Sequence, residues 1–495
     1  MTDLLKKARD YEAKAAAQIE PEERPAFHLT PYVGWMNDPN GFSRYGGKYH
    51  LFYQYNPYDT SWGPMHWGHA VSADLLHWDY LPCALACDEP YDRFGAFSGS
   101  ALELDDGRHL LMYTGVKEIP VPGKKEPDIR QTQCVAVGDG LNYRKYAGNP
   151  VISETDLPAG SSPVDFRDPK ILRTADGTYL CFAGCRAADG SGDILVFESP
   201  DALHWNFRNI LFRSRNRIGK MWECPDVFTL DGKTVLLSSP QDIRADQLEG
   251  LSGNCALAVV GDMDPDSGRL REEWVQPMDY GIDFYASQSV LTEDGRRVMI
   301  GWMQNWDACA ERGKDQKWFG QMSVPRELRI KNGRILQSPI RELASHRTNP
   351  EAWRGELDGD RQTTPFFRGR TADLEMTIRP GGTGGFRRFE MRFAQDETGS
   401  VYSSLVYRPE EGLLTVSRQH SGTCRALLHE RSCHVFSPDG ALKLRVILDR
   451  FSAEIFVNDG VQTMSMALYT GQSADRIGFH SDGRGTLDIR KYDLV

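Results

Sequence analysis

The sequence predicts an all-β protein, in which a five-bladed β-propeller is followed by a C-terminal β-sandwich and preceded by a short N-terminal helix. Three observations carry this prediction: a hairpin unit that recurs five times, strands of period two near the C-terminus, and helical spacing confined to the first residues. We expect a helical leader at residues 1–25, the propeller at 26–340, a connector at 341–371 and the sandwich at 372–495.

The recurring unit is a tight turn with glycine followed by an apolar strand. Five segments share it: GGKYHLFYQY, DGRHLLMYTG, DGTYLCFAGC, DGKTVLLSSP and DGRRVMIGWM. Gly-Gly and Asp-Gly are favoured hairpin turns, and the units recur every 55 to 70 residues with no regular helix between them. Such a series indicates the blades of a propeller. The alternative is five unrelated hairpins in an all-β sandwich, but the near copies SADLLHW and SPDALHW, whose Trp78 and Trp205 we expect to pack between sheets, favour repeated blades.

The flanking segments have different periods. Helical spacing predicts an amphipathic N-terminal helix through Leu4, Leu5, Ala8, Tyr11 and Ala15. Beyond the polar stretch 341–371, alternation at period two is typical of a sandwich and runs through ADLEMTIRP, FEMRFAQ, SSLVYRP, LLTVSRQ, LKLRVILD and AEIFVND. We expect the sandwich to pack on the propeller or to form a homodimer.

Composition narrows the partners and the compartment. The 495 residues are 40% apolar and 26% charged, which is ordinary for a soluble globular protein. A net charge of -11 argues against nucleic acid and anionic membranes as partners. With neither a signal peptide nor an apolar run that spans a membrane, the expected location is the cytoplasm. The ten cysteines are scattered singly, so we expect reduced thiols, no metal and no cofactor.

One position in each hairpin unit is polar in four of the five units. The position lies nine residues before each turn glycine, at Asp38, Ser98, Asp168, Glu223 and Ala286. Equivalent positions on successive blades lie in a ring, so these side chains are expected to converge. The prolines in NDPNG, RDPKI and ECPDV favour the start of a strand over its middle. The sequence therefore predicts three carboxyls at one end of a central channel.

Three clustered carboxyls suit glycoside hydrolysis better than metal binding, because no D-x-D-x-D-G loop is present. Glu223 is the better proton donor, since Glu has the longer reach and the higher intrinsic pKa. Arg167 is expected to keep Asp168 ionised, which leaves Asp38 as the nucleophile, although spacing alone does not decide that role. Nearby aromatic residues offer faces for sugar rings or belong to the core: Trp35, Phe42, Trp62, Phe97 and Trp222.

Two other groups compete for a chemical role. A Cys224 thiolate would need a nearby histidine base, and alternation along a strand predicts that Cys224 points away from the channel. His66 and His69 resemble a pair of metal ligands, but hydrogen-bonded structural histidines are the more common case.

At these residues the sequence resembles glycoside hydrolase family 32, which comprises invertases, inulinases and sucrose-6-phosphate hydrolases. The matching motifs, in family order, are WMNDPNG, FYQYNP, HWGHAVSADLLHW, FSGSA, FRDPK, WECPD, DFYASQ, GQMSVPREL and, in the sandwich, DRFSAEIFVNDG. The resemblance covers nearly the whole chain after residue 26. It implies a five-bladed propeller, a β-sandwich and a retaining attack on a β-fructofuranosyl carbon.

The resemblance also implies residue roles. Asp38 matches the nucleophile, Glu223 the acid/base, and Asp168 the residue that bonds the fructosyl hydroxyls. The fructose subsite is expected to be lined by Asn37, Gln54, Trp62, Phe97, Ser98 and Arg167, with Trp35 beside them. The implied activity is hydrolysis of sucrose 6-phosphate, sucrose or both.

The implied alternatives are a cytoplasmic fructo-oligosaccharide β-fructosidase and a fructosyltransferase, whereas a non-catalytic sugar-binding propeller would have no use for all three acids. A phosphate subsite needs Arg or Lys, and the candidates by position are Lys220, Arg312, Lys314 and Lys317.

Overall fold

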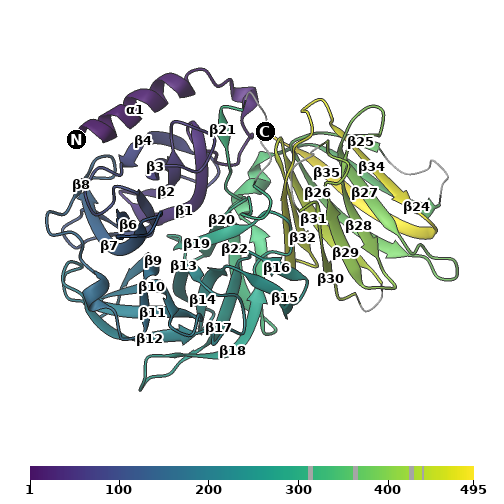
Figure 1. The fold of residues 1–495 in the computed structure, drawn as a ribbon. Coiled ribbons are helices and arrows are strands. Elements are labelled where there is room, and N and C mark those ends of the chain that lie inside the picture. The colour runs from purple at the N-terminus through teal and green to yellow at the C-terminus, as the bar shows by residue number, and fades with distance from the viewer. Residues whose placement is uncertain (310–315, 360–365, 423–427, 438–439) are drawn as a thin grey trace.

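The computed structural model describes residues 1–309, 316–359, 366–422, 428–437 and 440–495. Figure 1 shows two β domains side by side, with a helix along one edge of the first. In the described part of the chain this helix, α1 (Asp3–Ala16), is accompanied by three short 3₁₀ turns, η1 (Pro21–Glu23), η2 (Glu154–Asp156) and η3 (Arg341–His346). All other regular elements are strands, which confirms the all-β prediction.

The first domain consists of successive antiparallel sheets. The first sheet contains β1 (Gly34–Tyr45), β2 (Lys48–Asn56), β3 (His66–Ser72) and β4 (Asp79–Leu85). The next two contain β5 (Gly95–Glu103), β6 (His109–Ile119), β7 (Asp128–Gly138) and β8 (Tyr143–Lys145), then β9 (Ser161–Arg173), β10 (Tyr179–Ala187), β11 (Gly192–Ser199) and β12 (Asn206–Arg213). The last two contain β13 (Trp222–Leu230), β14 (Lys233–Pro240), β17 (Leu257–Met263) and β18 (Leu270–Pro277), then β19 (Tyr285–Leu291), β20 (Arg297–Trp302), β22 (Arg326–Lys331) and β23 (Arg334–Pro339). The connection between β14 and β17 of the fourth sheet contains a small two-stranded sheet, formed by β15 (Ile243–Leu248) and β16 (Leu251–Gly253).

The sheets form a closed ring, as expected of a propeller. Their first strands, β1, β5, β9, β13 and β19, contact one another in cyclic order. Strand β21 (Trp318–Phe319) also closes the ring: it follows β20 of the fifth sheet in the chain but pairs in parallel with Gly34 and Trp35 of β1 in the first sheet. Side chains at the start of the five first strands therefore face one centre.

The second domain is a sandwich of two six-stranded sheets. One sheet has the order β24 (Arg347–Asp358), β35 (Arg484–Leu494), β26 (Ala372–Pro380), β31 (Leu442–Asp449), β32 (Ser452–Val457) and β33 (Gln462–Ala467). The other has the order β25 (Phe366–Arg368), β34 (Arg476–Ser481), β27 (Phe389–Gln395), β28 (Ser403–Arg408), β29 (Leu413–Ser417) and β30 (Glu430–His434). Their inner faces share one core of aliphatic and aromatic side chains.

Two local expectations need correction. Residues 347–358 of the predicted connector 341–371 belong to the sandwich, because they form β24, which pairs with β35 along nearly its whole length. β24 is an edge strand whose residues 348–352 are all exposed, so its first half lacks the alternation that reveals a strand. In α1 the buried face contains Leu5, Ala8, Glu12 and Ala16, whereas Leu4 and Tyr11 are exposed. Glu12 is buried because its carboxylate accepts a hydrogen bond from the Cys83 amide of β4, and burial raises the pKa of Glu12 to about 7.

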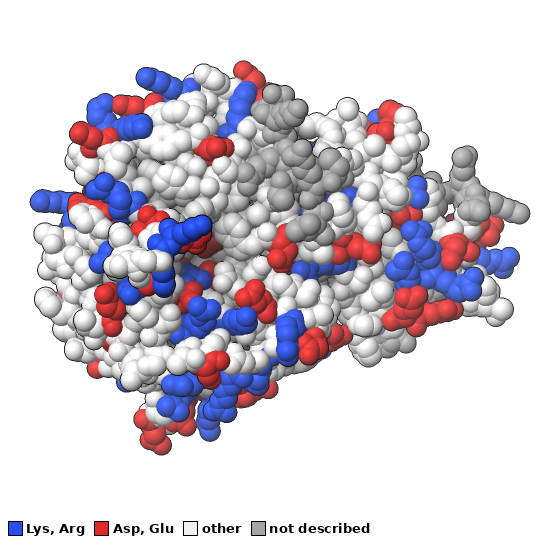
Figure 2. Space-filling view, in the orientation of Figure 1, with Lys and Arg blue, Asp and Glu red and all other residues white. Residues whose placement is uncertain are grey.

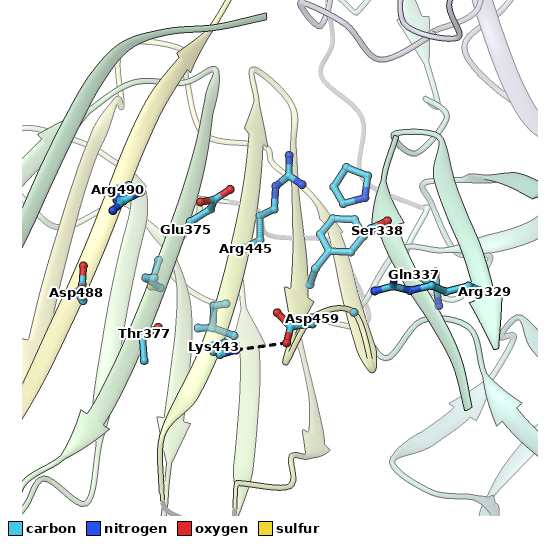
Figure 3. A pocket seen from close by; sticks show the side chains of 15 residues that line it. Arg329, Gln337, Ser338, Glu375, Thr377, Lys443, Arg445, Asp459, Asp488 and Arg490 are labelled. Atoms are coloured by element: carbon cyan, nitrogen blue, oxygen red, sulfur yellow. Dashed lines mark hydrogen bonds and ion pairs between the residues drawn. The ribbon is translucent and has the colours of Figure 1, made fainter. Parts of the chain in front are cut away.

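Figure 2 shows positive and negative side chains interspersed over one face of the molecule. A groove of about 570 Å³ follows the junction between the fifth sheet and the sandwich, and Figure 3 shows charged side chains of both signs lining it, with Lys443 and Asp459 3.4 Å apart. No helix in the described ranges has the length and apolar character needed to cross a membrane.

A buried chain of charges joins the two domains. Arg326 of β22 has no exposed surface and donates to Glu454 of β32 at 2.6 Å and to Asp279 at 3.0 Å. His28, in the segment that leads into β1, bridges the other oxygen of Glu454 at 2.9 Å and Asp449 at 2.8 Å. Burial opposes a charge on His28, but the two carboxylates outweigh it and raise the pKa of His28 to about 9.

This shift predicts that the protein loses stability in mild base. Because the folded-state pKa of His28 lies above the ordinary value of 6.5, its charge stabilises the fold fully below pH 6.5, and that contribution is lost as pH rises through about 9. The difference is on the order of 3 kcal/mol. Urea unfolding of the wild type between pH 6.5 and 9.5 should show the loss, and His28→Gln should lack it. Exposed His204→Gln serves as the control, and an unchanged pH slope in His28→Gln would contradict the assignment.

Candidate active site

Each first strand of the propeller breaks register with its neighbour near its start. The breaks lie between Met36 and Pro39, Phe97 and Gly99, Arg167 and Lys170, Glu223 and Asp226, and Tyr285 and Gln288. A bulge leaves residues unpaired and re-aims their side chains. The backbone φ is positive at three equivalent positions, Asp168 (63°), Cys224 (50°) and Ala286 (54°). Two neighbouring residues from every first strand are therefore available to the centre of the ring.

The bulges correct the predicted ring at one position. Its equivalent members are Asp38, Ser98, Asp168, Cys224 and Ala286, while Glu223 lies one residue earlier, together with Asn37, Phe97, Arg167 and Tyr285. Counting from the turn glycine fails in β13 because its hairpin turns in two residues, with Leu230 opposite Lys233, and the strand has no second bulge. The hairpin after β1 is equally short, but a second bulge between Asn40 and Ser43 restores the count there. The hairpin after β9 needs five residues between Arg173 and Tyr179.

Cys224 also differs from its prediction, because it points into the ring and not away from it. Its sulfur lies 3.4 Å from Asp38 Oδ2 and 3.7 Å from Asp168 Oδ2. The bulge breaks the alternation of side chains on which the expectation depended. Burial and the neighbouring carboxylates raise the pKa of the Cys224 thiol well above its usual value, so it remains a protonated donor and not a nucleophile.

Asp38, Asp168 and Glu223, the acid cluster from here on, are linked by short contacts. Asp38 Oδ2 accepts from Ser98 Oγ at 2.7 Å, and Asp38 Oδ1 accepts from Asn37 Nδ2 at 3.1 Å. Asp168 Oδ2 accepts from the Cys224 amide at 3.0 Å. Cys224 thus contacts both aspartates, and it directly follows Glu223 in the chain. The three acids therefore lie around one point.

Glu223 has two strong partners on opposite sides. Arg167 Nε donates to Glu223 Oε1 at 2.9 Å, and Tyr285 Oη lies 2.6 Å from Glu223 Oε2. Arg167 also donates to Asp165 at 3.0 Å and to Gln131 at 3.3 Å, which fixes its guanidinium. The sequence reasoning missed Tyr285, although it occupies the same place relative to its bulge as Arg167 and Glu223.

Crowding shifts the pKa values of Asp38 and Asp168. Burial and the charge of Glu223 raise the pKa of Asp38, against the hydrogen bonds from Ser98, Asn37 and Cys224. Burial and Glu223 likewise raise the pKa of Asp168 to about 7, and the Arg167 charge lowers it only in part. The expectation that Arg167 keeps Asp168 ionised is therefore wrong: Arg167 makes its ion pair with Glu223 instead.

The predicted aromatic faces separate into two groups. Trp35 is fully buried against Phe319, with ring centroids 5.1 Å apart, and its indole nitrogen donates to Asn37 at 2.8 Å. It therefore positions Asn37 and offers no open face to a sugar, and Phe42 and Trp222 are likewise core residues. Trp62 is 41% exposed and its ring lies 6.0 Å from that of Phe97. Gln54 is buried and donates to the Ala96 carbonyl beside Phe97.

The remaining candidates that the structure describes do not join the acid cluster. Lys317 is bound to Glu23 at 2.8 Å and to the Gln18 carbonyl at 2.6 Å, whereas Lys220 is exposed. Arg312 and Lys314 lie outside the described residues. His66 Nδ1 donates to the Pro64 carbonyl at 2.7 Å, and within the described ranges no three His, Cys, Asp or Glu side chains form a metal-binding group.

Comparisons with known proteins identify the family of the chain. Sequence models of the glycosyl hydrolases family 32 N-terminal domain and of the family 32 C terminal match residues 28–339 and 342–493. A raffinose invertase of Escherichia coli is 35% identical over 92% of both chains, and a sucrose-6-phosphate hydrolase of Escherichia coli is 34% identical over 90% of this chain and 89% of its own. A family 32 β-fructofuranosidase of Bombyx mori, solved as a mutant in complex with sucrose, is 33% identical, with a TM-score of 0.82 over 99% of this chain and 97% of that one. The chain therefore belongs to glycosyl hydrolase family 32 and is a glycoside hydrolase.

Proposed function

We propose that the protein is a retaining β-fructofuranosidase that hydrolyses sucrose 6-phosphate, sucrose or both, through a fructosyl-enzyme ester on Asp38. The observation that carries this proposal is the unequal environment of Asp38 and Glu223 within one acid cluster. Retaining hydrolysis needs one carboxylate that attacks and one carboxyl that delivers and retrieves a proton.

Asp38 is suited to attack. Its carboxylate accepts hydrogen bonds from Ser98, Asn37 and Cys224, and such bonds favour the ionised form that a nucleophile requires. None of the three donors carries a positive charge, so the carboxylate is not neutralised by an ion pair. Part of Asp38 remains exposed, which leaves the carboxylate open to a sugar.

Glu223 is suited to hold a proton. The Tyr285 hydroxyl has one hydrogen but two neighbours, Glu223 Oε2 at 2.6 Å and the Ser239 carbonyl at 2.8 Å. The hydroxyl donates its hydrogen to Glu223 Oε2 when Glu223 is ionised, and it can donate to Ser239 and accept from Glu223 when Glu223 carries a proton at Oε2. Both forms of Glu223 therefore keep a hydrogen-bond partner, as an acid/base requires. After proton transfer, the Glu223 carboxylate is stabilised by Arg167 and by reorientation of the phenol.

Asp168 is proposed to bind the fructosyl hydroxyls. Its Oδ2 is occupied by the Cys224 amide, while within the described residues nothing donates to its Oδ1. A free carboxylate oxygen beside the nucleophile is a good acceptor for two neighbouring hydroxyls.

The substrate proposal follows the names of the relatives, a raffinose invertase and sucrose-6-phosphate hydrolases, and the sucrose complex of the Bombyx mori enzyme. All point to a small fructoside with an unmodified fructose at its end. A phosphorylated substrate is delivered by uptake that is coupled to phosphorylation, so the proposal includes the cytoplasm as the location.

Removing the nucleophile tests the first role. Asp38→Asn should fold normally but lower kcat/KM for sucrose and for sucrose 6-phosphate by on the order of 10⁴-fold or more, because no ester can form. Asp105→Asn removes an exposed carboxylate that pairs with Arg173 and is the matched control. Wild-type turnover by folded Asp38→Asn would defeat the mechanism.

Replacing the proton donor tests the second role. Glu223→Gln should slow sucrose hydrolysis about 10²- to 10⁴-fold, because the glucosyl oxygen then leaves without a proton. The first step with fructosyl fluoride should be slowed far less, since fluoride needs no protonation. Single-turnover rates for the two donors give the comparison, and equal losses with both would assign Glu223 a different role.

A further inference from the structure

A cavity of about 700 Å³ lies beside the acid cluster, between the first and second sheets. It is lined by Trp62, Phe94, Arg93 and Lys117, together with Gly63, Pro64, Pro90 and Glu118. Aromatic rings connect it to the acids: the Trp62 ring lies 6.0 Å from both Phe97 and Phe94, and Phe97 directly precedes the Ser98 that bonds Asp38. A sugar that leaves from a fructose at Asp38 would pass over these rings into the cavity.

Two cations line the cavity without acidic partners. Arg93 and Lys117 form no ion pair with any residue in the described part of the chain. Lys117 of β6 lies directly opposite Arg130 of β7, so a third cation shares its face of the sheet. Like charges placed directly across two strands are destabilising. Glu118 also lines the cavity, but strand alternation directs it away from the face of Lys117 and Arg130.

The backbone holds Arg93 and Lys117 next to each other. The Phe94 amide donates to the Val116 carbonyl at 3.0 Å, so this bond is flanked by both cations. The preceding residue Asp92 is fully buried, where it accepts from Tyr113 at 2.8 Å and from Lys145 at 2.5 Å. These contacts fix the loop before β5, and an anion that binds there does not have to order it first.

We propose that Arg93 and Lys117, with Arg130 behind them, bind a phosphate monoester on the leaving sugar of the substrate. The inference rests on the proposed function, since it needs a fructoside at Asp38. It differs from the phosphate candidates expected from the sequence, of which Lys317 is ion-paired with Glu23, while Arg312 and Lys314 lie outside the described residues. The phosphate neutralises the like charges of Lys117 and Arg130, and the aromatic rings cover the sugar between the phosphate and the acid cluster.

Kinetics on two substrates test the proposal. The wild type should have a higher kcat/KM for sucrose 6-phosphate than for sucrose. Arg93→Gln combined with Lys117→Gln should lower the value for sucrose 6-phosphate about 10- to 100-fold, as expected from losing one or two charge-assisted hydrogen bonds. The value for sucrose should stay within about twofold, because neither residue touches the fructosyl unit. Glu118→Gln and Lys220→Gln are matched controls that should keep the preference for sucrose 6-phosphate. Lys117→Arg keeps the positive charge and should therefore keep this preference too.

The outcomes separate this inference from the proposed function. Hydrolysis of both sugars with the same ratio in the wild type and the Arg93/Lys117 double variant overturns the phosphate site and leaves the β-fructofuranosidase intact. If the wild type hydrolyses neither sugar, the proposed function fails, and a binding measurement then tests the phosphate site on its own. Calorimetric titration with glucose 6-phosphate, glucose and inorganic phosphate should show that only glucose 6-phosphate binds well and that the double variant loses this binding. No binding to the wild type, or equal binding to the double variant, overturns the site.

A loss of folding stability in Lys117→Gln can be told apart from a loss of phosphate binding. Lys117→Gln relieves the repulsion with Arg130, so its urea midpoint should equal or exceed that of the wild type. A lower midpoint would show that Lys117 stabilises the sheet, which contradicts the unpaired cation on which the proposal depends.

Discussion

The bulge at the start of each first strand is the constraint on which the active site depends. A regular strand sends only every second side chain toward the centre of a propeller. At the bulge two successive residues become available, so five strands deliver both the aspartates and their partners to one point. Asp168, Cys224 and Ala286 adopt positive φ there, a backbone conformation that a side chain seldom favours. The surrounding ladder hydrogen bonds hold these strained residues in place.

The carboxyls of the acid cluster have different environments because their neighbours differ. Three acids in one site cannot all be ionised cheaply, and burial with mutual repulsion raises the pKa of Asp38 and of Asp168. Asp38 is surrounded by neutral donors, whereas Glu223 lies between a guanidinium and a phenol that has a second acceptor. These unequal surroundings support the proposal that Asp38 attacks and Glu223 transfers the proton. Cys224, a neutral thiol between the aspartates, separates them without adding charge.

The sequence predicted the architecture well because turns and periodicity are local. Glycine turns and apolar strands identified the propeller, and period-two segments identified the sandwich. The predictions failed where a local rule was overridden. Cys224 turned inward because of the bulge, and the first half of β24 was hidden because an edge strand can be exposed on both faces. Glu223 lies one position from its predicted place because the β13 hairpin is short and the strand lacks the second bulge of β1. Arg167 was assigned to its chain neighbour Asp168, but its ion pair crosses to another sheet, which no single-sequence pattern contains.

The central claim is that Asp38 forms a covalent ester with the fructosyl unit, and intact-protein mass spectrometry tests it most directly. Glu223→Gln protein mixed with fructosyl fluoride should accumulate this ester, because the first step needs no acid while hydrolysis of the ester lacks its base. The account predicts a mass increase of one fructosyl group, located by digestion on the peptide that contains Asp38. An adduct on Asp168 or Cys224, or hydrolysis of the fluoride without any adduct, would contradict it.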